Sequence, residues 1–371
     1  MIKINILAGD ESFGLELFNG YWRPIFLHQK LFQQLKIKFK FFSKISKKIF
    51  YGDFLIISSR FFGTLTSDPR NSVVLNFLEN SFKKDIKIIW FDLRDSAGTT
   101  QFQVLPYVDF YVKKQLYKDL RIYTKDLYGG REYSNYYHKN FDIRDSGKYF
   151  MQKLDLKFKK KILLGWNLGV RNFSFFTKPR FIKLSLFLKN KIEFALNKNI
   201  SLNKIHLANS PKKKYNIFAN NRTEISRNSV RFQRELFRKK INLKYFNDSL
   251  INTDVPFKKF YKTLFETKIL LSLFGWGEVC YKEFEATVCG CAFVSPNMSN
   301  ILTWPNIYKK EETYIPVDWN LNNINSILTE LIKNDELRCK LVKNAQNEIK
   351  SIESENGKKF LNNLFKTFMN G

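Results

Sequence analysis

Residues 273–296 read LFGWGEVCYKEFEATVCGCAFVSP and form the most informative segment of this 371-residue chain. An apolar strand leads into a loop with Gly275 and Gly277, and a helix at about 279–289 precedes a second apolar strand at 292–295. Glycines let a backbone approach a ligand closely, and the helix that follows directs unpaired N–H groups at the loop. The segment therefore predicts an α/β unit whose loop suits a phosphate.

The same alternation extends from this segment toward both ends of the chain. Strands are expected at 2–8, 37–42, 54–58, 86–92, 108–112, 161–167, 215–219, 269–273 and 292–295, and helices at 24–35, 73–82, 181–196, 229–239, 321–333 and 335–352. Such alternation favours parallel sheets covered on both faces. A Pro- and Lys-containing linker near 209–214 separates two expected α/β domains, 1–209 and 210–371, the last helix packing back on the first. The cleft between them is the expected binding site.

The composition excludes several classes of protein. The chain has 63 Lys and Arg against 34 Asp and Glu, a net charge of +29, and 44% hydrophobic residues. That apolar content excludes an intrinsically disordered chain, and 16 Gly with 9 Pro exclude a fibrous one. No apolar run approaches the ~20 residues that a transmembrane helix needs. Four Cys without paired spacing predict a reduced, cytoplasmic compartment.

The net charge of +29 predicts a polyanionic neighbour, which is nucleic acid, an anionic membrane face or a phosphorylated substrate. Basic and aromatic residues alternate at 36–51 (KIKFKFFSKISKKIFY), as contact with a nucleic-acid backbone and stacked bases would require. Lys and Phe are nevertheless abundant throughout the chain, and no helix-turn-helix, zinc or RNA-binding signature accompanies them. Nucleic acid is therefore the less favoured partner.

The 273–296 segment resembles the nucleotide-sugar-binding signature of GT-B-fold glycosyltransferases, specifically the bacterial glycosyltransferase family 1-like proteins with a GWGE…FEA…CG pattern. Residues 296–308 (PNMSNILTWPNIY) and 314–317 (YIPV) continue the likeness. In the amino-terminal half, residues 90–102 (WFDLRDSAGTTQF), 107–115 (YVDFYVKKQ) and 127–130 (LYGG) look like the same group. The resemblance implies two Rossmann-like domains facing across a cleft, a donor nucleotide held by the second domain, and no metal requirement.

Two glutamates of the segment are candidate binding residues. Small and apolar neighbours surround Glu285, so its carboxylate needs a polar partner such as a ribose diol; pairing with a nearby Lys or Arg is the alternative. By position, the resemblance matches Glu285 to the family glutamate that grips the donor ribose. Retaining members often have two glutamates separated by seven residues, whereas six separate Glu278 from Glu285 here. The role of Glu278 and the stereochemical outcome therefore stay open.

A further binding residue is expected directly after the first strand of the second domain, at 220–224 (NNRTE). Such folds commonly place a basic residue there against the donor diphosphate, and an arginine fork makes two charge-assisted bonds to phosphate. We expect Arg222 to take this role, with Arg227 and Arg231 as reserves. The alternative is that these arginines only contribute to a basic surface.

Glycosyl transfer also needs a group that accepts or orients the proton of the acceptor hydroxyl. We expect this group on the first domain, where Asp95 lies in the 94–100 loop and Asp10 ends the first strand. His138, in an aromatic and basic setting, is the third candidate, and a plain turn or cap role is the alternative for each Asp. The three His lack paired ligand spacing, so no metal site is expected.

The sequence thus predicts a glycosyltransferase that moves a sugar from a nucleoside-diphosphate sugar to a glycan, lipopolysaccharide or lipid-linked acceptor, without cofactor or metal. A sugar-nucleotide epimerase of the same fold and a non-catalytic nucleic-acid-binding protein are the alternatives. We expect a cytoplasmic location, peripheral on the inner face of the membrane. Lysines at 36, 38, 40, 44, 47 and 48, interleaved with Phe39, Phe41 and Phe42, would contact lipid headgroups there, and a solubilising face over core aromatics is the alternative.

Overall fold

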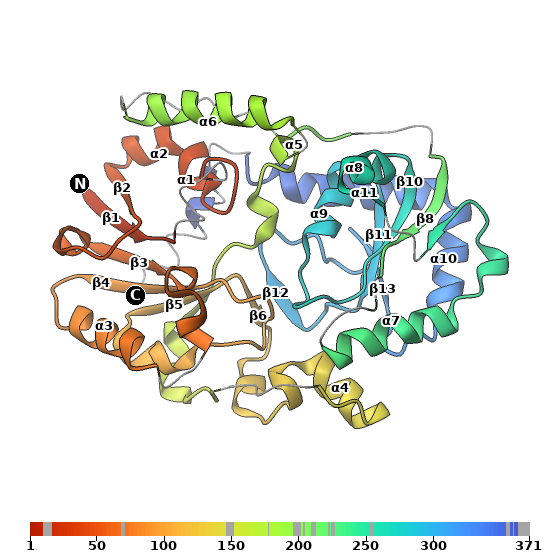
Figure 1. The fold of residues 1–371 in the computed structure, drawn as a ribbon, viewed down its shortest axis with the longest axis horizontal. Helices are drawn as coiled ribbons and strands as arrows, with labels where there is room; N and C mark the ends of the chain where they lie inside the picture. The colour runs from red at the N-terminus through yellow and green to blue at the C-terminus, as the bar shows by residue number, and fades with distance from the viewer. Residues whose placement is uncertain are drawn as a thin grey trace.

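The computed structural model describes most of the chain. The described residues are 1–9, 17–67, 71–145, 152–176, 178–195, 202, 205–208, 213–221, 223, 227–251, 255–353, 357–358 and 360–362. Within them the chain forms two α/β domains, each built on its own parallel sheet (Figure 1).

The first sheet has the strand order β2-β1-β3-β4-β5-β7, and every neighbouring pair is parallel. Its strands are β1 (Ile2–Leu7), β2 (Ile37–Phe42), β3 (Phe54–Ser58), β4 (Lys87–Asp92), β5 (Phe110–Lys113) and β7 (Ile162–Leu164). The central strands β3 and β4 are nearly continuous buried apolar runs, because helices and loops cover both faces of the sheet. The edge strand β2 instead exposes Lys38 and Lys40.

In the described part of the first domain, the α-helices are α1 (Arg23–Leu27), α2 (Gln29–Gln34), α3 (Ser72–Phe82), α4 (Glu132–Phe141), α5 (Phe173–Phe176) and α6 (Arg180–Ala195). The side chain of Asn71 accepts the N–H groups of Val73 and Val74 at 3.1 and 3.3 Å, which fixes the start of α3. The single helix expected at 24–35 is divided at His28, whose backbone leaves the helical region at φ −104° and ψ 21°.

The second sheet has the order β13-β11-β10-β8-β9. Its strands are β8 (Tyr215–Ala219), β9 (Leu250–Ile251), β10 (Thr267–Leu271), β11 (Ala292–Pro296) and β13 (Ile315–Val317), and its helices are α7 (Asn228–Lys240), α8 (Phe257–Phe265), α9 (Tyr281–Val288), α10 (Ile324–Lys333) and α11 (Asp335–Lys350). Taken in chain order, both sheets begin with the arrangement second-first-third-fourth-fifth. The order reverses between β1 and β3 and between β8 and β10, where ligands of doubly wound sheets bind.

The two domains pack closely against each other. A two-stranded antiparallel ladder joins β6 (Gln115–Tyr117) of the first domain to β12 (Ile301–Thr303) of the second. One buried apolar cluster includes Trp90 and Tyr111 of the first domain together with Phe274 and Phe284 of the second. The loops that follow β4 and β10 touch, so the carboxyl edges of the two sheets face each other. The expected fold class, two facing Rossmann-like domains as in the GT-B fold, is confirmed.

The chain after α11 returns to the first domain. Ile352 and Phe360 belong to the buried cluster of that domain, and the main-chain oxygen of Ile352 lies 2.8 Å from Nε2 of His28. Glu353 forms an ion pair with the buried guanidinium of Arg23. Among the described helices, none combines the length and the apolar character that crossing a bilayer requires.

Candidate functional site at the domain interface

A buried ion pair organises the carboxyl edge of the first sheet. Asp92 ends β4 and Lys113 ends β5, and the lysine Nζ lies 2.8 Å from the carboxylate with both side chains fully buried. The same Nζ donates to the main-chain oxygen of Thr99 at 2.8 Å, and the hydroxyl of Tyr111 donates to Asp92. These bonds hold the 94–100 loop against the sheet, so the loop presents a fixed surface to the second domain.

Glu278 lies in that contact. Its buried carboxylate accepts hydrogen bonds from Ser96 Oγ at 2.8 Å, the N–H of Ala97 at 2.9 Å and Gln115 Nε2 at 2.9 Å. All three donors belong to the first domain. In this arrangement the carboxylate joins the two domains, and the predicted contact of Glu278 with a donor would compete with these bonds.

Gly277 makes the close backbone approach that its sequence context predicts, but the approaching group belongs to the protein. A Cβ at this position would lie 1.8 Å from the main-chain oxygen of Asp95. Any side chain would therefore separate the 94–100 loop from the glycine loop. At Gly275 a Cβ would lie 3.3 Å from Cys280 Sγ, its nearest neighbour, so no first-domain atom comes as close.

The three candidates for a proton acceptor have different surroundings. Asp95 lies at the interface beside Gly277, its side chain is 60% exposed, and Oδ1 is 3.5 Å from Nζ of the buried Lys114. Burial lowers the pKa of Lys114, which the charge of Asp95 partly offsets. His138 lies in α4, where Nδ1 is 3.1 Å from the oxygen of Ile143 and the ring stacks on Tyr128. Asp10 is outside the described residues, and the structure thus brings Asp95 alone of the described candidates to the glycine loop.

The loop between β8 and α7 carries the next group of polar side chains. Arg222 lies outside the described residues, so its predicted role remains a prediction. Asn221, directly after β8, is fully buried, and neither its Oδ1 nor its Nδ2 has a hydrogen-bond partner among the described residues. Because an unpaired buried amide costs free energy, Asn221 marks a place where a polar ligand would be stabilising.

Arg227, named from the sequence only as a reserve, is buried in the same loop. Its Nη1 donates to the hydroxyl of Tyr133 at 2.9 Å and to the main-chain oxygen of Trp276 at 2.8 Å, while Nε has no partner in the described part of the chain. The guanidinium also lies over the half-exposed ring of Trp276, 4.6 Å from the ring centre. The geometry therefore fixes a cation beside an accessible aromatic ring.

Glu285 is mostly buried on α9, and its Oε1 accepts a hydrogen bond of 2.7 Å from the hydroxyl of Tyr261 in α8. Burial raises the pKa of Glu285, which the Tyr261 bond and the charge of Arg171 partly offset. A cavity of about 480 Å³ lies beside Tyr261, with Phe173, Phe265 and Cys289 in its wall. Phe265 and Cys289 mark the ends of α8 and α9 that are remote from the glycine loop, so this cavity is not at the carboxyl edge.

Glu283 is the carboxylate that sequence reasoning missed. It is fully buried in the first turn of α9, where Oε1 accepts a 2.5 Å bond from Ser272 Oγ and Oε2 has no partner among the described residues. Burial raises the pKa of Glu283 to about 7. Its place directly after the glycine loop was the only available signal, because its charge alone predicted a solvated helix face.

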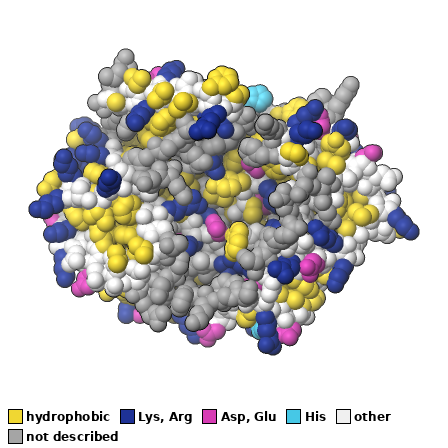
Figure 2. All heavy atoms as spheres, viewed as in Figure 1, with side chains coloured by type: hydrophobic (Ala, Val, Ile, Leu, Met, Phe, Trp, Pro, Cys, Tyr) yellow, Lys and Arg dark blue, Asp and Glu magenta, His cyan; other side chains and the backbone are white. Residues whose placement is uncertain are grey.

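Charged side chains of the first domain gather around Lys114, at the edge that faces the second domain. The charges of Arg60, Lys113 and Asp95 all act on Lys114. Figure 2 shows dark blue and magenta side chains in the middle of the molecule, between the two domains. In the part of the chain that the structure describes, no three His, Cys, Asp or Glu side chains gather as metal ligands.

Of the comparisons with known proteins, the one with solved structures found similar chains. No family model and no curated protein matches the chain. The chain is similar to the UDP-GlcNAc 2-epimerase of Neisseria meningitidis bound to UDP-GlcNAc, at 11% identity and a TM-score of 0.39 over 98% of this chain and 100% of that one. It is also similar to a glycosyltransferase of Rickettsia africae, at 12% identity and a TM-score of 0.40 over 100% and 99%. These similarities assign no residue and no reaction.

Proposed function

We propose that this chain binds a nucleoside-diphosphate sugar on its second domain and transfers the sugar to a glycan or lipid-linked acceptor on its first. One observation carries the proposal: polar atoms of the buried Asn221 and Arg227 have no partner among the described residues at the point where the second sheet reverses its strand order. Ligands of doubly wound sheets bind at this point, and buried polar atoms without partners are rare.

The residues at this edge suit the parts of such a donor. The guanidinium of Arg227 is held by Tyr133 and the Trp276 carbonyl, so its remaining donor capacity can bind a diphosphate with little loss of side-chain entropy. The ring of Trp276 offers a stacking surface. Glu283, in the first turn of α9, has a carboxyl group whose Oε2 is without a partner among the described residues and can hydrogen-bond a hydroxyl of a ribose or a sugar. Glu285 lies further along α9 and would first have to release the hydroxyl of Tyr261.

Asp95 is the proposed proton acceptor. It is exposed on the 94–100 loop and borders Gly277 across the interface. As the acceptor oxygen bonds to the anomeric carbon, Asp95 takes the hydroxyl proton and the bond from that carbon to the diphosphate oxygen breaks. The nucleoside diphosphate leaves with the electron pair, and the cation of Arg227 stabilises its charge.

Thermal shift with a panel of nucleoside diphosphates tests the donor site. We expect one or two of UDP, GDP, ADP and dTDP to raise Tm by several degrees, since a ligand at about 100 times its Kd adds ~2.7 kcal/mol of stability. Arg227→Lys and Asn221→Leu should each lose most of this shift. Lys239→Arg, on the exposed end of α7, is the matched control and should keep it. Equal shifts for all variants would contradict the assigned site.

Product analysis then separates the reactions. Release of the nucleoside diphosphate that depends on an added glycan or lipid-linked acceptor supports transfer. Conversion of the sugar nucleotide into an epimer without any acceptor would contradict transfer and establish an epimerase instead. Steeply salt-dependent binding of RNA or DNA, with no response to any nucleotide, would contradict both enzymes.

A further inference from the structure

Helix α6 exposes a continuous apolar stripe. Phe181, Leu184, Leu188 and Ile192 are three or four residues apart, so they share one face of the helix, and their exposed fractions lie between 48% and 73%. Single exposed apolar residues are ordinary on protein surfaces, but four in a row along one helix face are not. Figure 1 shows α6 along the upper edge of the molecule, on the outside of the first domain.

The opposite face of α6 is already packed on the protein. Asn190 is buried, and the ring of Phe187 lies 6.0 Å from that of Phe18 in the core of the first domain. The helix is therefore fixed in its rotation, because the packed face holds it. The apolar stripe points away from the core as a consequence of this packing.

Cations flank the stripe on both sides. The sequence of α6 contains Arg180, Lys183, Lys189 and Lys191 against Glu193 as its one acid. Lys189 and Lys191 are exposed, and helical geometry places them on opposite borders of the apolar stripe. Figure 2 shows hydrophobic side chains beside dark blue ones along the same upper edge.

The apolar stripe and its flanking lysines together indicate the kind of surface that α6 would contact. An apolar face bordered by lysines is typical of a helix that lies in the interface of an anionic bilayer. A second copy of this chain would bring another basic face, and a net charge of +29 opposes that approach. At 16 residues, α6 is also shorter than the ~20 that spanning would need.

We infer that α6 is an interfacial anchor, which inserts Phe181, Leu184, Leu188 and Ile192 between the lipids of an anionic membrane surface. Lys189 and Lys191 then contact the headgroups. This places the membrane contact on a different element from the lysines at 36–48. The inference is independent of the proposed donor site, since binding to lipid requires no nucleotide.

Vesicle co-sedimentation of the full chain tests the anchor. We expect binding to vesicles of phosphatidylcholine with phosphatidylglycerol, and binding to phosphatidylcholine alone that is weaker by at least about tenfold. The variant Leu184→Asp with Leu188→Asp should lose at least about tenfold in affinity for the anionic vesicles, since apolar insertion and charge attraction both weaken.

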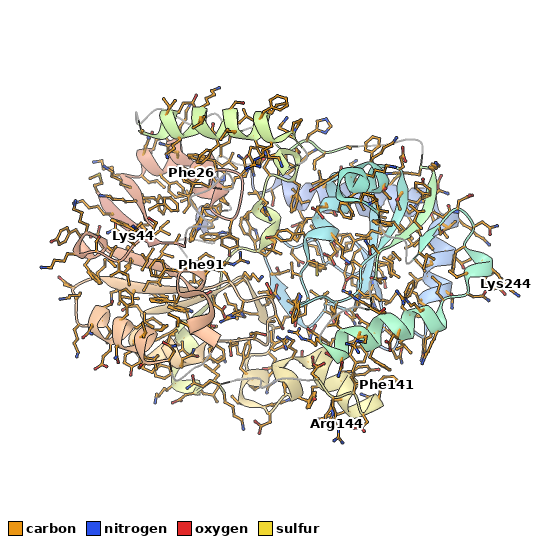
Figure 3. All side chains as sticks on the ribbon, viewed as in Figure 1. Phe26, Lys44, Phe91, Phe141, Arg144 and Lys244 are labelled. Carbon is orange, nitrogen blue, oxygen red and sulfur yellow. The ribbon has the colours of Figure 1, made fainter. Side chains whose placement is uncertain are left out.

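The matched control is Leu243→Asp with Tyr245→Asp. These residues are 57% and 71% exposed, and the substitution changes the net charge by the same amount. Lys244, between them in the sequence, is labelled at the right edge of Figure 3, on the second domain and away from α6 along the top. The control should bind anionic vesicles within about twofold of the original chain. It keeps the apolar stripe, so only the small effect of the lower net charge remains.

Three outcomes would overturn the inference. One is equal loss in the control and the α6 variant, which would assign binding to overall charge. The second is absence of binding to anionic vesicles by a chain whose Tm shows it to be folded. The third is a dimer in sedimentation velocity that dissociates in the α6 variant without any vesicle binding, which would assign the stripe to a second copy.

Discussion

The two sheets have the same strand order, but the buried charged groups at their carboxyl edges are paired in one sheet and partly unpaired in the other. At the first edge the charged Asp92 and Lys113 pair with each other, and the described atoms left without partners include the neutral hydroxyls of Ser58 and Thr100. At the second edge the described atoms left without partners include Nε of Arg227 and Oε2 of Glu283, both in ionisable groups. Neutral hydroxyls suit the hydroxyls of an acceptor, the guanidinium of Arg227 suits the charges of a diphosphate, and the carboxyl group of Glu283 suits a ribose or sugar hydroxyl.

The difference shows that two sheet edges with the same strand order can pair their buried polar groups differently. A charge paired inside the protein cannot also bind a ligand, because removing its partner leaves it buried and unpaired. The first edge therefore acts mainly as a scaffold that positions the 94–100 loop. The second edge keeps buried polar atoms of Asn221, Arg227 and Glu283 without partners among the described residues, so a ligand that pairs with them would stabilise it.

The largest expected effect follows from breaking the ion pair between Asp92 and Lys113 at the first edge. Lys113→Met leaves Asp92 buried without its cation, so we expect the free energy of unfolding to fall by about 3–5 kcal/mol. Denaturant unfolding measures this. The double variant Asp92→Asn with Lys113→Met removes both charges and should recover much of the loss. Lys87→Met, which removes an exposed partner of Asp109, is the control and should change little.

A pH profile tests the second edge through Glu283. Burial raises the pKa of Glu283 to about 7, so the folded state keeps its proton at pH values where the unfolded chain, with an ordinary pKa near 4.5, has lost it. Stability should therefore fall as the pH rises from about 4.5 to 7, by roughly 3 kcal/mol at most, and stay level above that range. Glu283→Gln should remove most of this fall, and the raised pKa of Glu285 accounts for a remainder.

The matched control for the pH profile is Glu330→Gln, at an exposed position of α10. It should keep the fall in stability between pH 4.5 and 7. A Glu283→Gln variant that still shows the full fall would contradict the assignment of this pKa to Glu283. In that case the carboxyl group of Glu283 would be as well paired as the charged groups of the first edge.

Much of the fold follows from local patterns, and the exceptions have physical causes. The expected strands at 54–58 and 215–219 match β3 and β8, because buried apolar runs between loops are strong signals. The pairing of β6 with β12 was not predicted, since it depends on how the domains pack. Helix α4 was not predicted, although its buried Tyr133 and Tyr137 are four residues apart, as one face of a helix requires.

The site was harder to predict than the fold. Asp95 was expected in a strand-end loop of the first domain, and the structure adds that this loop touches Gly277 of the second domain. The partners of Glu278 and Gly277 could not be predicted, since Ser96, Ala97 and the Asp95 carbonyl lie about 180 positions away in the chain. The sequence suggests that Glu283 is a surface charge, whereas in the fold its carboxyl group is buried and Oε2 has no partner among the described residues. Whether one turn of a helix is buried depends on the packing of the whole fold, so the sequence of that turn does not predict it.

Glu278→Gln tests the contact between the two edges. The amide keeps the shape of the side chain but loses the charge, and its NH₂ group cannot accept the bond from Ala97 N or from Gln115 Nε2. We expect the free energy of unfolding to fall by about 1–3 kcal/mol, as for the loss of hydrogen bonds to a charged group. Glu312→Gln, at an exposed position, should leave it unchanged. Equal stability of both variants would show that the contact is not held by Glu278.

Asp95→Asn has the smallest expected effect on stability and separates function from scaffold at the first edge. Its side chain is 60% exposed and its pair with Lys114 is 3.5 Å long, so removing the charge should cost about 1 kcal/mol or less. A proton acceptor typically contributes a factor of about 10²–10⁴, so acceptor-dependent release of the nucleoside diphosphate should fall by about that factor in single-turnover assays.

Asp126→Asn, on an exposed loop of the same domain, should alter neither quantity. Unchanged turnover in Asp95→Asn would contradict the role of Asp95 as the proton acceptor. A large loss of stability with little loss of turnover would instead make Asp95 part of the scaffold, and the two edges would then differ more completely than we propose.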